Sequence, residues 1–157
     1  MKIKSNTQKI AISGVFMALY IVLMYFTQNF AFGQYQIRIA TSLYAFAGVY
    51  PFLILPMGIG NMVSNMIMGG LGIFDIIGGL IVGIVTTSGI YMIKRFNLND
   101  WFIALPIIFG SGLIVPIWLS FILNVPYKIL AVSLCTGQVI PSIVGVIMVK
   151  EFKKRLK

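Results

Sequence analysis

A few polar side chains interrupt the apolar segments of this chain, and they are the residues that could bind a small molecule. Asp75 and Arg38 stand in or beside apolar segments, where an ionised side chain is costly and by default marks a functional site. Asn61 and Asn65 are four residues apart, so they share one face of a predicted helix. Because an unpaired amide in hydrocarbon is expensive, both must face another helix, a cavity or a ligand. For Asp75, capping a helix N-terminus is the alternative role.

Four more residues complete the predicted binding site. Gln36 precedes Arg38 in a polar loop, and Gln138 lies in the middle of the last apolar segment. Trp118 and Tyr127 offer aromatic faces, although both residue types also anchor helices at membrane interfaces. The loops that carry Gln36, Asp75 and Tyr127 are expected on one side of the membrane. We therefore predict a polar pocket that opens outward.

The residue inventory argues against catalysis. The chain has no histidine, three acidic residues and a single cysteine, Cys135, so no catalytic triad, zinc site or disulfide can be assembled. No GxxxxGK[ST] loop is present to cradle the phosphates of a nucleotide. We expect a binding protein that is not an enzyme and that needs neither a metal nor another cofactor.

The composition is that of an integral membrane protein. Of 157 residues, 59% are hydrophobic and 10% are charged, and the mean hydropathy is +1.00, whereas soluble domains average about 45–50% apolar and about 25% charged residues. Residues 1–157 are expected to form one membrane domain. The net charge of +9 comes mostly from lysines and arginines that flank apolar segments. That distribution indicates membrane topology rather than nucleic-acid binding.

Hydropathy divides the chain into a small number of membrane segments. One of them, 39–68, should break near Pro51–Pro56 into two short helices, because proline removes a helical hydrogen bond. With that break the chain is an all-α membrane protein with six transmembrane helices and cytoplasmic N- and C-termini, an arrangement that places both Lys94-Arg95 and the basic C-terminus inside. The apolar segments are 10–26, 39–68, 73–93, 101–123 and 129–149.

Small residues indicate where helices approach closely. Gly79 and Gly83 form a small-xxx-small face that should pack tightly against another helix. In the first helix, Gly14 and Ala18 share a face close to Ala11, and this patch either packs internally or docks a second membrane protein. The third loop contains Gly69, Gly70 and Gly72, which predicts a flexible lid.

Three stretches together resemble a known family. They are Q-I-R-I-A-T-S-L at 36–43, P-M-G-I-G-N-M-V-S-N at 56–65 and G-I-F-D-I-I-G-G at 72–79. They are similar to the queuosine-precursor transporter (QueT) family, which comprises substrate-binding S components of energy-coupling factor (ECF) transporters. The resemblance covers residues 8–95 well and the last two helices by pattern. It implies six helices in a bacterial plasma membrane and a pocket open to the outside. It also implies two ATPase subunits and a transmembrane coupling protein as partners.

The chain departs from the family pattern at two places. An acidic residue is expected three positions after the family's arginine, and here Thr41 stands there, which leaves room for altered specificity. The first-helix pattern A-x-x-x-A becomes Ala11-x-x-x-Val15 beside Gly14-x-x-x-Ala18.

The chemistry of a 7-deazaguanine base agrees with the implied function. Asp75 could accept two adjacent N–H groups of the base in a bidentate, charge-assisted pair. The carbonyl oxygen of the base needs donors, which Asn61, Asn65, Gln138 or Arg38 can supply, and Trp118 or Tyr127 could stack on its plane. The alternatives are an S component for queuine or another vitamin-like heterocycle, or a small self-contained transporter.

Overall fold

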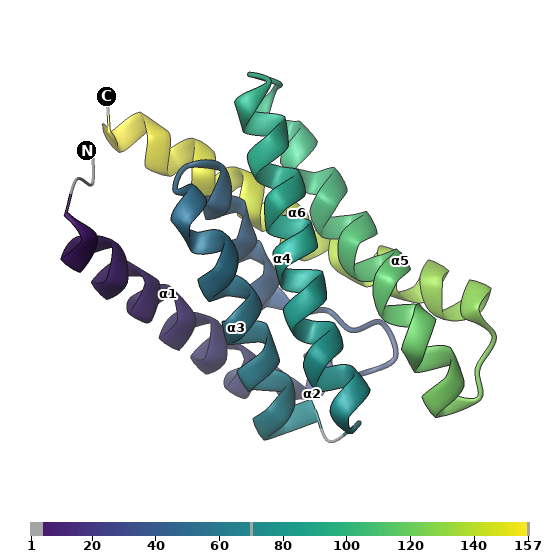
Figure 1. The fold of residues 1–157 in the computed structure, drawn as a ribbon. Helices are drawn as coiled ribbons and strands as arrows, with labels where there is room; N and C mark the ends of the chain where they lie inside the picture. Colours follow the sequence, from purple (N-terminus) through teal and green to yellow (C-terminus); the bar gives the residue numbers. More distant parts are fainter. Residues whose placement is uncertain (1–4, 70, 157) are drawn as a thin grey trace.

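The computed structural model describes residues 5–69 and 71–156, and within these residues every regular element is helical (Figure 1). The predicted all-α class is therefore confirmed. The α-helices are α1 (Asn6–Phe26), α2 (Gln28–Ala31), α3 (Ile54–Ser64), α4 (Ile73–Arg95), α5 (Ala104–Leu123) and α6 (Tyr127–Leu156). The 3₁₀ segments are η1 (Ile39–Gly48), η2 (Pro51–Leu53) and η4 (Asp100–Ile103), and η3 (Asn65–Gly69) is a π-turn.

Five helical segments of the described chain are long and apolar enough to cross a membrane. They begin with α1 and continue with η2–α3–η3, α4, η4–α5 and α6. The remaining apolar helix, η1, has ten residues. A 3₁₀-helix rises about 2 Å per residue, so η1 extends about 20 Å, less than the hydrocarbon thickness of about 30 Å. The count of six full spans thus stays a prediction.

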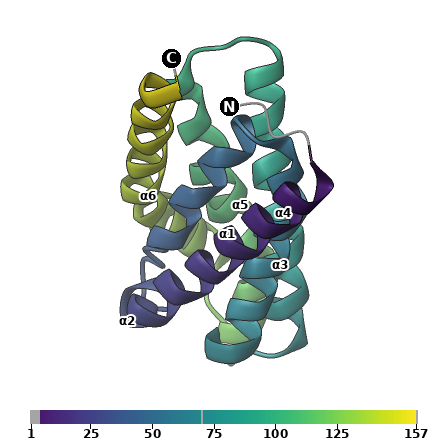
Figure 2. The same cartoon turned by 90° about the vertical axis from the view of Figure 1, so that its left-hand side faces the viewer.

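The elements run up and down between two ends of one bundle (Figure 2). The start of α1, the end of α6 and the α4–α5 connection lie together at one end, and α2, the α3–α4 loop and the α5–α6 loop lie at the other. At the first end, the carboxylate of Asp100 forms ion pairs with Lys94 and with Lys153, the latter at 2.6 Å. The basic residues at 94–95 and 153–155 therefore gather at one end, as the predicted topology requires.

The break within 39–68 falls where the prolines predicted it. Tyr50 interrupts the chain after η1, and Pro51 occupies the first position of η2. Pro56 lies in the first turn of α3, where a backbone N–H has no helical acceptor, so the helix tolerates it. The sequence pattern did not indicate that the residues before the break form a 3₁₀-helix rather than an α-helix.

Glycines allow α3 and α4 to pack closely. A β-carbon on Gly83 would lie 2.6 Å from the α-carbon of Gly58, and one on Gly79 would lie 2.8 Å from the side-chain nitrogen of Asn65. Both distances are too short for a methyl group, so the predicted close approach at Gly79 and Gly83 is confirmed.

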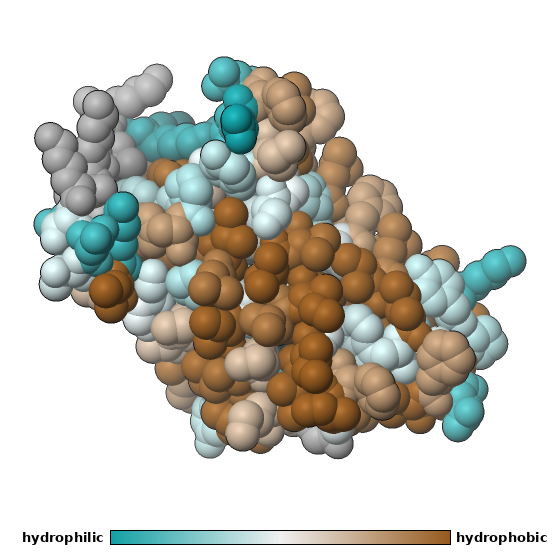
Figure 3. All heavy atoms as spheres, in the orientation of Figure 1, coloured by the Kyte–Doolittle hydropathy of each residue, from teal (hydrophilic) through white to brown (hydrophobic). Residues whose placement is uncertain are grey.

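The outer surface of the bundle is apolar. Figure 3 shows hydrophobic residues over the middle of one face and hydrophilic residues toward its margins. The helix α1 is the least buried candidate span, with only Tyr20 and Met24 fully inside the protein. Large apolar side chains facing outward suit contact with lipid or with another membrane protein.

Candidate functional site

A polar cavity lies inside the bundle, between η1, α3, α4, α5 and α6. Its free volume is about 10 Å³, roughly enough for one water molecule. Several lining residues follow helical spacing, such as Asp75, Gly79 and Val82 on α4, so each helix turns one stripe of its surface inward. The cavity is lined by Gln36, Arg38, Thr41, Asn61, Asn65, Asp75, Gly79, Val82, Ser111, Val115, Trp118, Leu134 and Gln138.

Arg38 is held in the cavity by two asparagines. Its Nη1 donates to the Oδ1 atoms of Asn61 and Asn65, each at 3.1 Å. The guanidinium carbon lies 4.9 Å from the centroid of the Phe32 ring, a cation–π geometry. Arg38 is 5% exposed, and its Nε has no hydrogen-bond partner. A buried guanidinium with a free N–H is a donor available to a ligand.

The same asparagines join α3 to α4. The side-chain nitrogen of Asn61 donates to the carbonyl oxygen of Gly79 at 2.9 Å, and that of Asn65 donates to the carbonyl oxygen of Asp75 at 2.9 Å. Each amide therefore uses its nitrogen for helix packing and its oxygen to orient Arg38. The amide orientations follow from these partners, because a backbone carbonyl can only accept.

Asp75 does not act as a helix cap. It is the third residue of α4, and no side-chain hydrogen bond caps the α4 N-terminus at Gly72. Its Oδ1 accepts a hydrogen bond from the indole nitrogen of Trp118 at 3.3 Å, while its Oδ2 is buried without a partner. A β-carbon on Gly69 would lie 2.9 Å from that Oδ2, so the end of η3 covers the carboxylate.

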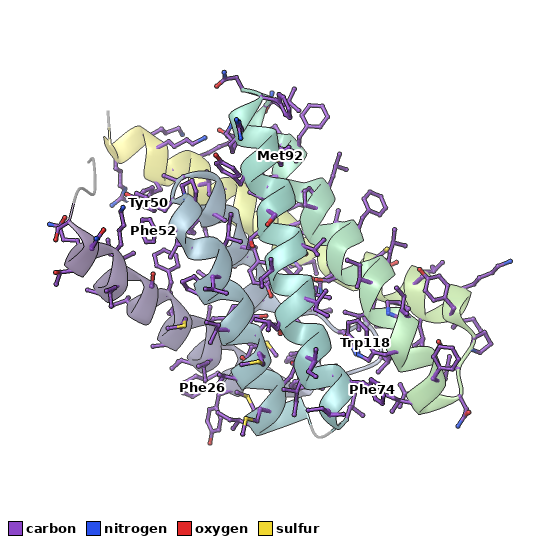
Figure 4. All side chains as sticks on the ribbon, in the orientation of Figure 1. Phe26, Tyr50, Phe52, Phe74, Met92 and Trp118 are labelled. Atoms are coloured by element: carbon purple, nitrogen blue, oxygen red, sulfur yellow. The ribbon has the colours of Figure 1, made fainter. Side chains whose placement is uncertain are left out.

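Trp118 lines the cavity from α5 and lies between α4 and α5 (Figure 4). Its ring packs directly on Gly78, where a β-carbon would lie 2.5 Å from the ring. The contact fixes the plane of the indole, and the bond to Asp75 fixes its rotation. The side chain is half-buried, with Phe74 beside it on the outer surface of α4.

Gln138 connects α6 to η1 and to the loop before it. Its Oε1 lies 2.8 Å from the hydroxyl of Thr41, and its Nε2 donates to the carbonyl oxygen of Gln36 at 2.7 Å. The Thr41 hydroxyl also lies 2.7 Å from the carbonyl oxygen of Arg38, so its single hydrogen has two acceptors. Gln36 adopts a left-handed backbone conformation with φ of 44°.

The charges of the cavity balance without forming an ion pair. Arg38 is the only cation among the lining residues, and Asp75 is the only acid. Each has a fully buried polar atom without a hydrogen-bond partner, the Nε of Arg38 and the Oδ2 of Asp75. An unsatisfied buried polar group costs about 1–3 kcal/mol or more when it is charged. A ligand that brings one acceptor and at least one donor would remove both penalties.

Seven of the eight predicted site residues line this cavity, and Tyr127 does not. Tyr127 begins α6 and is 40% exposed, and its hydroxyl donates to the carbonyl oxygen of Leu113 on α5. The prediction did not place Thr41, Ser111 or the apolar lining residues in the site. Thr41 had a signal, since it lies one turn after Arg38, but nothing in the sequence separates Ser111 from other membrane serines.

Two other predictions concern the third loop and the first helix. In that loop Gly69 and Gly72 are described, with Gly72 at a positive φ of 84°, while Gly70 lies outside the described residues. In α1, Ala11, Gly14 and Ala18 are all exposed, and a β-carbon on Gly14 would meet nothing within 4 Å. The small-residue patch is therefore not packed inside this chain.

Comparison with known proteins gives one match. The family model described as QueT transporter matches residues 10–154, nearly the whole chain. No curated protein and no solved structure matches the chain.

Proposed function

We propose that this chain, which belongs to the QueT transporter family, is the membrane-embedded S component of an ECF importer and captures a 7-deazaguanine precursor of queuosine from outside the cell. The family is one of transporters, not of enzymes, and its name indicates a queuosine precursor as cargo. The observation that carries the finer proposal is the pair of buried, unpartnered atoms on Arg38 and Asp75 in one small cavity.

The chemistry of the base fits these two atoms. The pyrimidine edge of a 7-deazaguanine carries adjacent N–H donors, for which the Oδ2 of Asp75 is a free acceptor. The carbonyl oxygen of the base is an acceptor for the free Nε–H of Arg38. Trp118, held against α4, offers an aromatic face at the cavity wall. Together these contacts would recognise the base by hydrogen bonding and stacking.

Capture requires the cavity to expand. A two-ring base is several times larger than the single water molecule that the free volume of about 10 Å³ would hold. The contact between Gln138 and the loop before η1 is a side-chain hydrogen bond, whereas α3 and α4 are closely packed along their backbones. The loop can therefore move away from Gln138 more readily than α3 can move away from α4. Binding therefore couples to movement of the walls.

The topology proposed for this function has six membrane crossings in a single domain. The crossings are α1, η1, the segment η2–α3–η3, α4, α5 and α6, with both chain ends in the cytoplasm of a bacterium. The last turns of α4 and α6 are basic, and Lys94 and Lys153 from them both pair with Asp100. These helix ends lie at the end of the bundle that carries the start of α1, which supports this orientation. The cavity then opens toward the end that carries α2, on the outside of the cell.

The exposed face of α1 is the proposed contact for the transmembrane coupling protein. Small residues at Ala11, Gly14 and Ala18 allow another helix to approach closely in lipid, where no hydrophobic force draws helices together. Two ATPase subunits bound to the coupling protein would hydrolyse ATP, since this chain has no phosphate-binding loop.

Two measurements test the proposal. Calorimetric titration of the purified protein with 7-cyano-7-deazaguanine, 7-aminomethyl-7-deazaguanine and queuine should show saturable binding of one of the first two bases, with guanine as the control. Tightest binding of queuine would favour the alternative cargo, and no binding of any base would reject the function. Co-purification with ATPase subunits separates an S component from a self-contained transporter.

A further inference from the structure

A second hollow lies directly beside the binding cavity, at the end of the bundle that carries α2. This entrance groove has a volume of about 330 Å³, in the range of small-molecule sites. Its walls come from the segment after α2, the α3–α4 loop and the facing ends of α5 and α6. Gln36 and Leu134 line both the entrance groove and the cavity, so these two side chains belong to a wall that the two spaces share.

One wall of the entrance groove is a short irregular segment, residues 33–37, which we name the strap. It joins α2 to η1, and side chains of α6 bind its backbone. The hydroxyl of Ser133 donates to the carbonyl oxygen of Gln34 at 2.9 Å, and Nε2 of Gln138 donates to the carbonyl oxygen of Gln36 at 2.7 Å.

The carbonyl group between these two, that of Tyr35, packs against α6 at Gly137. A β-carbon on Gly137 would lie 1.8 Å from the carbonyl oxygen of Tyr35, so only glycine permits the contact. Ser133 and Gly137 lie one turn apart on one face of α6, and Gln138 is the next residue along the helix. Two carbonyls of the strap therefore accept hydrogen bonds from Ser133 and Gln138, and the carbonyl between them packs on Gly137. We name these three residues of α6 the latch.

The strap depends on the latch for its conformation. Gln36 has a φ of 44°, in the left-handed region that residues other than glycine seldom adopt. Two backbone bonds support the strap from its own side, from the amide of Gln36 to Gly33 and from the amide of Ile37 to Phe30. On its other face lies an open groove lined by Gln34, Tyr35 and residues of α6, so the strap has space into which it can move.

We propose that the strap is the gate between the entrance groove and the cavity, and that the latch on α6 holds it shut. The inference rests on the proposed function and adds the path by which the base enters. Opening the strap would withdraw Gln36 from the wall that separates the two spaces. Gln138 belongs to both the latch and the cavity wall, so the base, once inside, lies against the side chain that holds the gate.

A gate held by the latch has a distinctive kinetic signature. The latch bonds are present in the closed state with or without ligand, so weakening them raises the open population equally in both. Association and dissociation rates then rise by the same factor, and the dissociation constant is unchanged. A residue that contacts the ligand instead changes the dissociation constant, mainly through the dissociation rate.

Ser133→Ala removes one latch bond without touching the cavity lining. The matched control is Thr136→Val, which removes a hydroxyl one turn further along α6 that bonds only the carbonyl of Val132. Stopped-flow mixing with 7-cyano-7-deazaguanine follows Trp118 fluorescence in a Trp101→Phe background. Ser133→Ala should raise both rates about fivefold, the factor for one neutral hydrogen bond of about 1 kcal/mol, and the control should raise neither. Unchanged rates, or a change in dissociation alone, would overturn the gate.

Hydrogen exchange of the empty protein tests the latch without any ligand. The amides of Gln36 and Ile37 should exchange about fivefold faster in Ser133→Ala and at the wild-type rate in Thr136→Val. Equal exchange in all three proteins would overturn the latch. If wild type binds none of the bases while exchange still rises in Ser133→Ala, the proposed cargo fails and the latch stands. If the bases bind and exchange does not rise, the latch fails and the cargo stands.

Discussion

Asp75→Asn is the sharpest test of the binding site. In the wild-type protein Oδ1 is taken by the indole N–H of Trp118, and Oδ2 is buried without a partner on a residue that lines the cavity. An asparagine would keep its oxygen toward Trp118, since that partner only donates, and would turn its amide N–H₂ toward the ligand. The N–H donors of the base would then meet another donor. We expect a loss of about 2–4 kcal/mol, from a lost charged bond and an unpaired donor.

That loss corresponds to a rise of about 30- to 1,000-fold in Kd, which calorimetric titration measures. The melting temperature of the empty protein should stay the same or rise, because the variant removes a buried charge whose second oxygen has no partner. The matched control is Asp100→Asn, an acid at the opposite end of the bundle that pairs with Lys94 and Lys153. It should leave the affinity unchanged. Unchanged affinity in Asp75→Asn would refute the acceptor role, and a fall in both affinity and melting temperature would indicate a structural role instead.

Three other predictions have definite expected outcomes. Gly14→Trp or Ala18→Trp should preserve ligand affinity but abolish uptake and co-purification with the coupling protein, because bulk on the exposed face of α1 blocks close helix contact. The control is Phe109→Trp, at an exposed position of α5. A parallel loss of affinity in the α1 variants would contradict the docking role. Gly83→Ala should lower stability by about 1–3 kcal/mol in thermal unfolding, since its β-carbon would lie 2.6 Å from the α3 backbone, whereas Gly14→Ala should not. Tyr127→Phe should bind the base like wild type in titration, because Tyr127 lies outside the cavity; weaker binding would return it to the site.

Most of the polar residues that line the cavity could be found from sequence because polar groups are expensive in hydrocarbon. Arg38, Asp75 and Gln138 stand out against apolar neighbours, and the four-residue spacing of Asn61 and Asn65 places them on one helical face. Aromatic residues carry a weaker signal, since Trp and Tyr also occur at membrane interfaces. That ambiguity explains why Trp118 lines the cavity while Tyr127 anchors the start of α6.

Other features depend on tertiary packing that composition does not record. The sequence of η1 shows no sign of its 3₁₀ geometry. The contacts of Ser133 and Gly137 with the strap join residues far apart in the chain, so they could be seen only in the structure. The sequence pattern of Gly14 and Ala18 is the same for a patch that packs inside the chain and for one that faces outward. Its exposure had to come from the placement of α3 on the opposite side of α1.

The unsatisfied atoms connect the fold to the function. The Asn61 amide satisfies both its nitrogen and its oxygen within the protein, which shows that this interior can meet the needs of buried polar groups. Arg38 and Asp75 nevertheless keep free atoms beside the same small cavity, and they do not pair with each other. A direct ion pair would stabilise the empty state and would have to be broken by each incoming ligand. Under the proposed function, keeping the two charges apart, each with one buried atom free, leaves the empty protein less stable and lets a ligand supply the missing partners.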